Sequence, residues 1–118
     1  MENAYSARRR STRHPLAVPI ELRCAGQPYP TQSETTDISL HGCYVKTLFP
    51  VAAGTLIGIR MTLNGTEVLA KAMVKTADQG LGNGIEFVEF IADGKHQLQE
   101  YLNSLAAPEA EPSSTIIR

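Results

Sequence analysis

The chain has 118 residues, of which 42% are hydrophobic and 19% are charged, a composition that suits one small folded domain and excludes a wholly disordered chain. Its formal net charge of −1 by itself argues against a polyanionic partner. The charge is unevenly distributed, however. Residues 1–13 hold four arginines and one acidic residue, a local charge of +3, whereas residues 14–118 hold seven basic and eleven acidic residues, a charge of −4. We therefore expect a flexible basic arm at 1–13, one folded domain at 14–107, and a disordered, Pro- and Glu-containing tail at 108–118.

Export and membrane insertion have no support in the sequence. The longest stretch free of charge and strong polarity, residues 48–59, contains a proline and two glycines and is shorter than the ~20 apolar residues of a spanning helix. The N-terminal arginines are not followed by the apolar segment of a signal peptide. We expect a cytoplasmic protein in which Cys24 and Cys43 are free thiols. Since the histidines lie far apart and have no Cys or His at metal-ligand spacing, we expect no metal site.

Alternation of apolar and polar residues, the pattern of half-buried strands, dominates the chain from residue 18 onward. A polar, Thr-rich segment follows the first alternating run and is expected to return antiparallel to it. Between two later runs, Asn64 and Gly65 predict a tight hairpin, because both residues tolerate the positive φ angles of a type I′ turn. The last run is entered through a glycine-marked bend at Gly80. The expected strands cover residues 18–24, 31–37, 43–48, 57–63, 68–74 and 81–89.

The period changes only near the C-terminus. Leu98, Tyr101, Leu102 and Leu105 follow the i, i+3, i+4, i+7 spacing of an amphipathic helix, and Asp93 stands at a suitable place for its N-cap. Six short antiparallel strands with one helix predict an all-β fold. We expect a closed barrel with the helix packed on it, because closure removes exposed strand edges in so small a domain.

Two short polar motifs stand beside the first strands. The first is Arg-x-x-x-Arg at residues 9–13, directly preceded by Arg8; on its own, such a run is also typical of a solvated basic tail. The second is Asp-x-Ser-x-x-Gly at residues 37–42, between the second and third expected strands. On its own it is equally typical of an ordinary turn, since Asp, Ser and Gly favour turns.

Together, in this order and around a strand that begins Val-Pro-Ile at residues 18–20, the two motifs resemble those of the PilZ domain family. Residues 82–87 also resemble its last barrel strand, so that the likeness covers about residues 8–105. The resemblance implies a bacterial cytoplasmic receptor for cyclic di-GMP, built as a six-stranded antiparallel (split) β-barrel with a C-terminal α-helix. The ligand-binding residues that it implies are Arg8, Arg9, Arg13, Asp37, Ser39 and Gly42.

The chemistry of these residue types suits that ligand. Cyclic di-GMP carries two phosphodiester charges and two guanines, and the planar fork of arginine can bind phosphate or the O6 and N7 atoms of guanine. The Asp37 carboxylate can accept from the N1–H and N2 amine of the other guanine edge. Ser39 can donate to phosphate or sugar, and Gly42 lets the backbone turn sharply or approach the ligand. Arg8 resembles the family variant that takes an intercalated pair, so we expect two ligand molecules per chain.

The arm is expected to change its state when ligand binds. Fixing the backbone of residues 8–13 costs roughly 6–12 kcal/mol, whereas each charged hydrogen bond returns about 1.5–3 kcal/mol. Several arginine contacts must therefore form together, and the arm should be mobile without ligand. Its ordering would alter the surface shown to a downstream protein partner. We expect a monomer or weak dimer that needs no resident cofactor and regulates a process such as motility or biofilm formation.

Three other functions are less consistent with the sequence. A PilZ-like protein-interaction module that does not bind the nucleotide would share the fold. An enzyme would need more than the polar side chains of Asp37, Ser39 and His41, since the sequence shows no nucleophile elbow or oxyanion-hole pattern. Binding of single-stranded nucleic acid favours a basic groove with exposed aromatic residues, whereas aromatic residues make up 6% of this chain. Tyr44 could add a ligand contact or simply face solvent.

Overall fold

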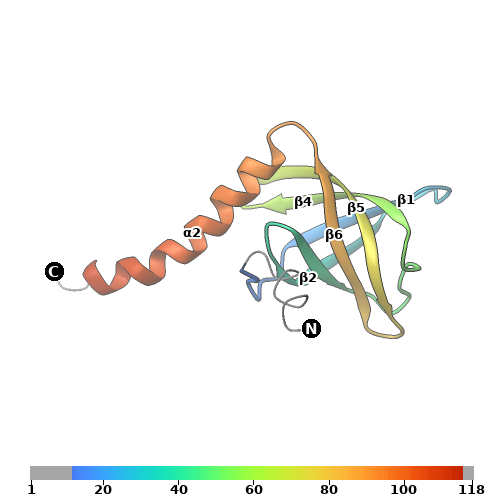
Figure 1. Cartoon of the computed structure of the whole chain (residues 1–118), viewed down its shortest axis with the longest axis horizontal. Coiled ribbons are helices and arrows are strands. Elements are labelled where there is room, and N and C mark those ends of the chain that lie inside the picture. Colours follow the sequence, from blue (N-terminus) through green and yellow to red (C-terminus); the bar gives the residue numbers. More distant parts are fainter. Residues whose placement is uncertain (1–11, 116–118) are drawn as a thin grey trace, which may run out of the picture.

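The computed structural model describes residues 12–115, with side chains as far as residue 105 (Figure 1). Six strands and one helix follow in chain order: β1 (Pro19–Cys24), β2 (Thr31–Ile38), β3 (Gly42–Lys46), β4 (Leu56–Leu63), β5 (Thr66–Asp78), β6 (Gly82–Phe90) and α2 (Gly94–Thr115). All neighbouring strands are antiparallel, in the order β1-β2-β3-β6-β5-β4, and pairing of β1 with β4 closes the barrel. The predicted six-stranded antiparallel barrel with a C-terminal helix is confirmed.

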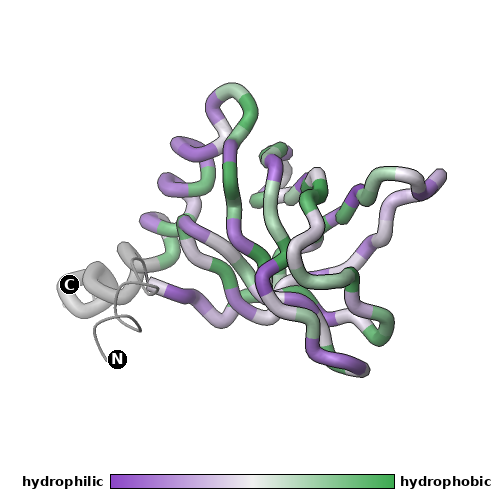
Figure 2. Tube along the Cα trace, turned by 45° about the vertical axis from the view of Figure 1, so that its right-hand side comes forward, coloured by the Kyte–Doolittle hydropathy of each residue, from purple (hydrophilic) through white to green (hydrophobic). Residues whose placement is uncertain are grey.

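Alternate residues of the strands fill the barrel interior. On β1, Ile20 and Leu22 are buried, whereas Arg23, which follows Leu22, is exposed. Figure 2 shows the same change between hydrophobic and hydrophilic residues along the strands. Asn64 and Gly65 have φ angles of 51° and 88°, as the predicted β4–β5 hairpin requires. The pattern of period two thus places the side chains that form the core.

The helix α2 packs beside β5 through one apolar face. Leu98 and Leu102 are buried, and Tyr101 and Leu105 are half-buried against the core, which confirms the predicted spacing. Asp93 directly precedes the helix, and its carbonyl accepts from the Gln97 N–H at 3.0 Å. The helix runs to Thr115 and so includes residues 108–115, where the sequence suggested a tail; the domain boundaries proposed above stay predictions.

No helix within residues 12–115 is both long and apolar enough to cross a membrane. Cys24 and Cys43 are both free, as predicted, with Cys43 buried in the core and Cys24 partly buried against it. In the described part of the chain, no group of three His, Cys, Asp or Glu residues could hold a metal ion.

A buried hydroxyl ties the segment before β1 to β2. Thr35 Oγ1 donates to the Leu16 carbonyl at 2.6 Å and accepts from the Val18 N–H at 2.9 Å. Farther toward the N-terminus, His14 exchanges two backbone hydrogen bonds with Ile38, at 2.8 and 2.9 Å. The chain from His14 to Val18 is therefore held along β2, and it delivers Arg13 to the place where β2 ends.

A β-bulge in β2 decides which side chains of this strand face outward. Thr35 pairs with Val45 and Asp37 pairs with Tyr44, so Thr36 is an extra residue in the ladder. Strict alternation from the buried Thr35 would direct Asp37 into the core. The bulge reverses this order, and Asp37 is half-exposed while Ile38 is fully buried.

We expect Thr35→Val to destabilise the protein by about 1–3 kcal/mol, because valine fills the same space but leaves the Val18 N–H and the Leu16 carbonyl unpaired. Urea unfolding followed by circular dichroism measures the change. Thr36→Val, at the exposed neighbouring position, is the matched control and should change stability by no more than about 0.5 kcal/mol. Equal stability of the two variants would contradict the role given to the Thr35 hydroxyl.

Candidate functional site

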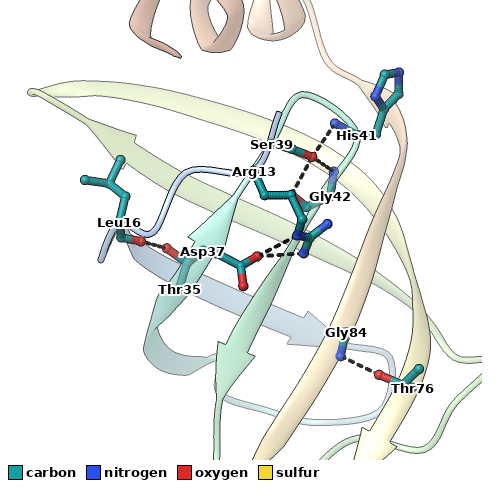
Figure 3. A network of polar contacts seen from close by, with 9 residues as sticks. All are labelled: Arg13, Leu16, Thr35, Asp37, Ser39, His41, Gly42, Thr76 and Gly84. Atoms are coloured by element: carbon teal, nitrogen blue, oxygen red, sulfur yellow. Dashed lines mark hydrogen bonds and ion pairs between the residues drawn. The ribbon is translucent and has the colours of Figure 1, made fainter. Parts of the chain in front are cut away.

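The two sequence motifs meet at Arg13 and Asp37, as Figure 3 shows. Arg13 Nη2 donates to Asp37 Oδ1 at 2.6 Å, and Arg13 Nε donates to the same oxygen at 3.1 Å. The side chains are 38% and 32% exposed, so solvent screens the ion pair and leaves both groups accessible. The structure thus joins the second arginine of one motif to the acidic residue of the other, across 24 positions of sequence.

The Ser39 side chain holds the turn between β2 and β3. Its Oγ accepts from the N–H groups of His41 and Gly42 at 3.1 and 3.2 Å, and it donates to the Gly42 carbonyl at 3.3 Å. The Ser39 N–H also donates to the Gly42 carbonyl, at 2.8 Å. Ser39 is only 2% exposed. Its hydroxyl is therefore engaged in forming the turn, and a contact with phosphate or sugar stays a prediction.

Gly42 is required by the closeness of β6. Its φ angle is not positive, and a Cβ atom at this position would collide with the Ile85 carbonyl oxygen. Register pairs Gly42 with Glu86, and the Phe87 N–H donates to the His41 carbonyl at 2.9 Å. The sequence suggested a sharp turn or an approach to the ligand, but the structure gives packing of strand against strand as the reason.

The remaining predicted site residues, Arg8 and Arg9, lie outside the described residues. Their assignment as ligand-binding residues stays a prediction, based on their place five and four residues before the described Arg13.

Cys43 lies inside the barrel behind the ion pair. Burial and, to a smaller extent, the charge of Asp37 raise the pKa of its thiol, the charge of Arg13 lowers it, and together they bring it to about 12. The thiol therefore stays protonated at neutral pH and is a core group rather than a nucleophile or a metal ligand.

Tyr44 is a residue of this surface whose place the sequence left open. It is the direct cross-strand partner of Asp37, and partners in an antiparallel ladder point to the same face of the sheet. The sequence signal for Tyr44 is its place in an alternating strand, two residues after the glycine of the second motif. That signal predicts an outward direction, but it does not reveal Asp37 as the neighbour.

Two features together identify the family of this protein. One is the closed antiparallel barrel that carries the Asp-x-Ser-x-x-Gly motif, and the other is the arginine that precedes β1 and binds the Asp of that motif. The PilZ domain family model matches residues 7–104. The chain therefore belongs to the PilZ domain family.

Solved structures of similar fold agree with this assignment. The PilZ domain of CeSA from a cellulose synthesizing bacterium is 27% identical, with a TM-score of 0.58 over 84% of this chain and 99% of that one. The PilZ domain of YcgR from Escherichia coli, solved with c-di-GMP, is 17% identical, with a TM-score of 0.69 over 91% of this chain and 98% of that one.

The inhibitor of motility MotI (DgrA) of Bacillus subtilis is 14% identical, with a TM-score of 0.71 over 84% of this chain. The match covers 52% of MotI, so this chain spans about half of that protein's length. Among curated proteins, none matches the chain at a significant level.

We expect Gly42→Ala to destabilise the fold by about 1–3 kcal/mol, because the added methyl group forces β3 away from the Ile85 carbonyl. Gly58→Ala is the matched control, since Gly58 is also a strand glycine without a positive φ and its Cβ would meet only the Arg23 Cβ, at 3.9 Å. The control should be neutral or slightly stabilising. Thermal unfolding of both variants measures the difference, and a Gly42→Ala protein as stable as the control would refute the packing argument.

Proposed function

We propose that this PilZ domain is a receptor for cyclic di-GMP that binds the nucleotide between its arginine arm and the motif at residues 37–42. The observation that carries the proposal is the Arg13–Asp37 ion pair, which unites the two motifs on the outside of the barrel. Membership of the family and the c-di-GMP in the similar YcgR domain support the same ligand. The role is binding and signalling, not catalysis.

Arg13 and Asp37 bind each other in this structure, and the ligand would replace this contact. A half-exposed pair of this kind contributes no more than about 1 kcal/mol, whereas a hydrogen bond to a charged group contributes about 1.5–3 kcal/mol. Cyclic di-GMP offers a phosphate or a guanine O6 and N7 edge to Arg13 and the guanine N1–H and N2 donors to Asp37. Each partner thus exchanges one charged contact for another that is at least as strong.

Arg8 and Arg9 complete the proposed site. With Arg13 they place three guanidinium groups within six residues of sequence, which suits the four phosphate charges of two stacked ligand molecules. We therefore propose a stoichiometry of two cyclic di-GMP molecules per chain. Ser39 and Gly42 would bring backbone and hydroxyl groups of the β2–β3 turn next to the ligand.

The signal would pass through the arm. When arginines on residues 8–13 close on ligand held against the barrel, the outer surface near β2 changes, and a downstream protein reads the difference. We propose that this occurs in the cytoplasm, with the chain as a monomer or weak dimer, in control of motility or biofilm formation.

Arg9→Ala and Arg13→Ala should each weaken cyclic di-GMP binding about 10- to 100-fold, because each loses charged hydrogen bonds. Asp37→Ala should weaken it by a similar factor, since two guanine donors are left unpaired. Titration calorimetry measures affinity and stoichiometry together, with GTP and a single-stranded oligonucleotide as competing ligands. We expect neither competitor to bind as tightly as cyclic di-GMP.

Arg23→Ala is the control for these variants. Arg23 also forms an ion pair, with Glu21 at 3.1 Å. It lies near the C-terminal end of β1, whereas Arg13 precedes the N-terminal end of that strand, so its loss should leave binding unchanged. If the parent protein binds no cyclic di-GMP, the chain is a PilZ-like interaction module without nucleotide. If it binds one molecule per chain, the proposed stoichiometry is wrong.

Amide hydrogen exchange of residues 5–16 should slow on saturation with cyclic di-GMP, because ordering of the arm protects its N–H groups. The β4–β5 hairpin, which lies in the same barrel but carries no site residue, serves as the internal control and should exchange at the same rate with and without ligand. Equally fast exchange of residues 5–16 in both states would refute the ordering of the arm.

A further inference from the structure

A row of four residues crosses the outside of the barrel next to the ion pair. Register pairs Asp37 of β2 with Tyr44 of β3, Tyr44 with Gly84 of β6, and Gly84 with Thr76 of β5. Figure 3 shows three of the four, namely Asp37 on β2, Gly84 on β6 and Thr76 on β5; Tyr44 lies on β3, between β2 and β6. Because directly paired residues share a face of the sheet, the Tyr44 side chain has the Asp37 carboxylate on one side and a position without a side chain on the other.

The Tyr44 ring leans over the glycines of β6. A Cβ atom at Gly82 would collide with the Val45 carbonyl oxygen and would also lie 2.8 Å from Tyr44 Cε2. A Cβ atom at Gly84 would lie 2.5 Å from Thr76 Oγ1 and in ordinary contact, 3.8 Å, with Tyr44 Cδ1. Neither glycine has a positive φ angle, so space, and not backbone conformation, accounts for them. One face of the ring therefore lies on the backbone of β6, and since Tyr44 as a whole is only partly buried, part of the ring is open to solvent.

The phenol hydroxyl is held at its far end. Tyr44 Oη donates to Asp78 Oδ2 at 2.5 Å. Burial, this hydrogen bond and the charge of Asp78 raise the pKa of Tyr44 to about 12, so the phenol stays neutral and remains a donor. With its Cβ fixed on β3 and its hydroxyl fixed on β5, the ring is held across β6 as a flat surface.

We propose that the Tyr44 ring is the surface on which a guanine base of the ligand stacks, with Asp37 reading the edge of that base and Asp78 positioning the ring. The inference rests on the proposed function and adds a binding residue to it. A base lying flat over the row presents its N1–H and N2 edge sideways, which is where the neighbouring carboxylate of Asp37 stands. The glycines beneath the ring leave no side chain to compete with the base.

Tyr44→Leu tests the proposal by titration calorimetry with cyclic di-GMP. Loss of one base–aromatic stack should lower the affinity about 5- to 100-fold, while Tyr44→Phe, which keeps the ring, should retain most of it. Tyr29→Leu is the matched control, because Tyr29 is a highly exposed tyrosine in the β1–β2 connection and its loss should leave binding unchanged. Circular dichroism confirms that each variant is folded.

Tyrosine fluorescence gives a second measurement that needs no destabilising change. The chain has no Trp and four Tyr residues, so tyrosine dominates its emission. Tyr29→Phe and Tyr44→Phe each keep three tyrosines and so have equal absorbance. Ligand stacked on Tyr44 should quench the emission of Tyr29→Phe more than that of Tyr44→Phe, which lacks the stacking residue. Equal quenching in both overturns the proposal.

The two hypotheses fail differently. If Tyr44→Leu binds like the parent while Arg13→Ala does not, the stacking role is wrong and the receptor function stands. If the parent itself does not bind cyclic di-GMP, the receptor function is wrong and the role of Tyr44 falls with it.

Discussion

The bulge at Thr36 is the constraint on which the site depends. Because side chains of a strand alternate between two faces, one extra residue exchanges inside for outside in everything that follows. Thr35, before the bulge, points inward and ties down the chain that precedes β1. After the bulge, Asp37 points outward to meet Arg13, and Ile38 enters the core while its backbone holds His14. A regular strand would bury the carboxylate and separate the two motifs.

Buried hydroxyl groups on either side of this bulge make the surroundings of Asp37 stiff. Thr35 Oγ1 bonds to the segment before β1, and Ser39 Oγ bonds within the β2–β3 turn. Each satisfies backbone groups that have no strand partner there, and leaving such buried groups unpaired costs about 1–3 kcal/mol each. Asp37 therefore has a fixed position between two anchored points. The variable part of the site is the arginine that reaches it, whose contact is half-exposed and easily exchanged.

The strands, the helix and the two motifs could be predicted from the sequence, because each depends on the periodicity or spacing of residues that are close together in the chain. The β4–β5 hairpin followed from Asn64 and Gly65 alone. The bulge could not be predicted from the sequence, because the Thr-rich run of β2 has too few apolar residues to show where the inward-facing and outward-facing positions exchange. The packing reason for Gly42 was also hidden, because the Ile85 carbonyl lies 43 positions away. Tyr44 needed the same long-range register, which pairs β3 with β6 and places glycines beneath its ring.

The ion pair also sharpens the meaning of the charge distribution. The +3 arm and the −4 remainder would suit many anions if Arg13 stood alone, but Arg13 is bound to Asp37. An anion that takes Arg13 leaves the Asp37 carboxylate without its partner and next to a like charge, an arrangement that repels. A phosphate backbone offers nothing to offset this. A guanine nucleotide brings both an acceptor for Arg13 and paired N–H donors for Asp37, so the pair favours a ligand that carries both groups over a simple polyanion.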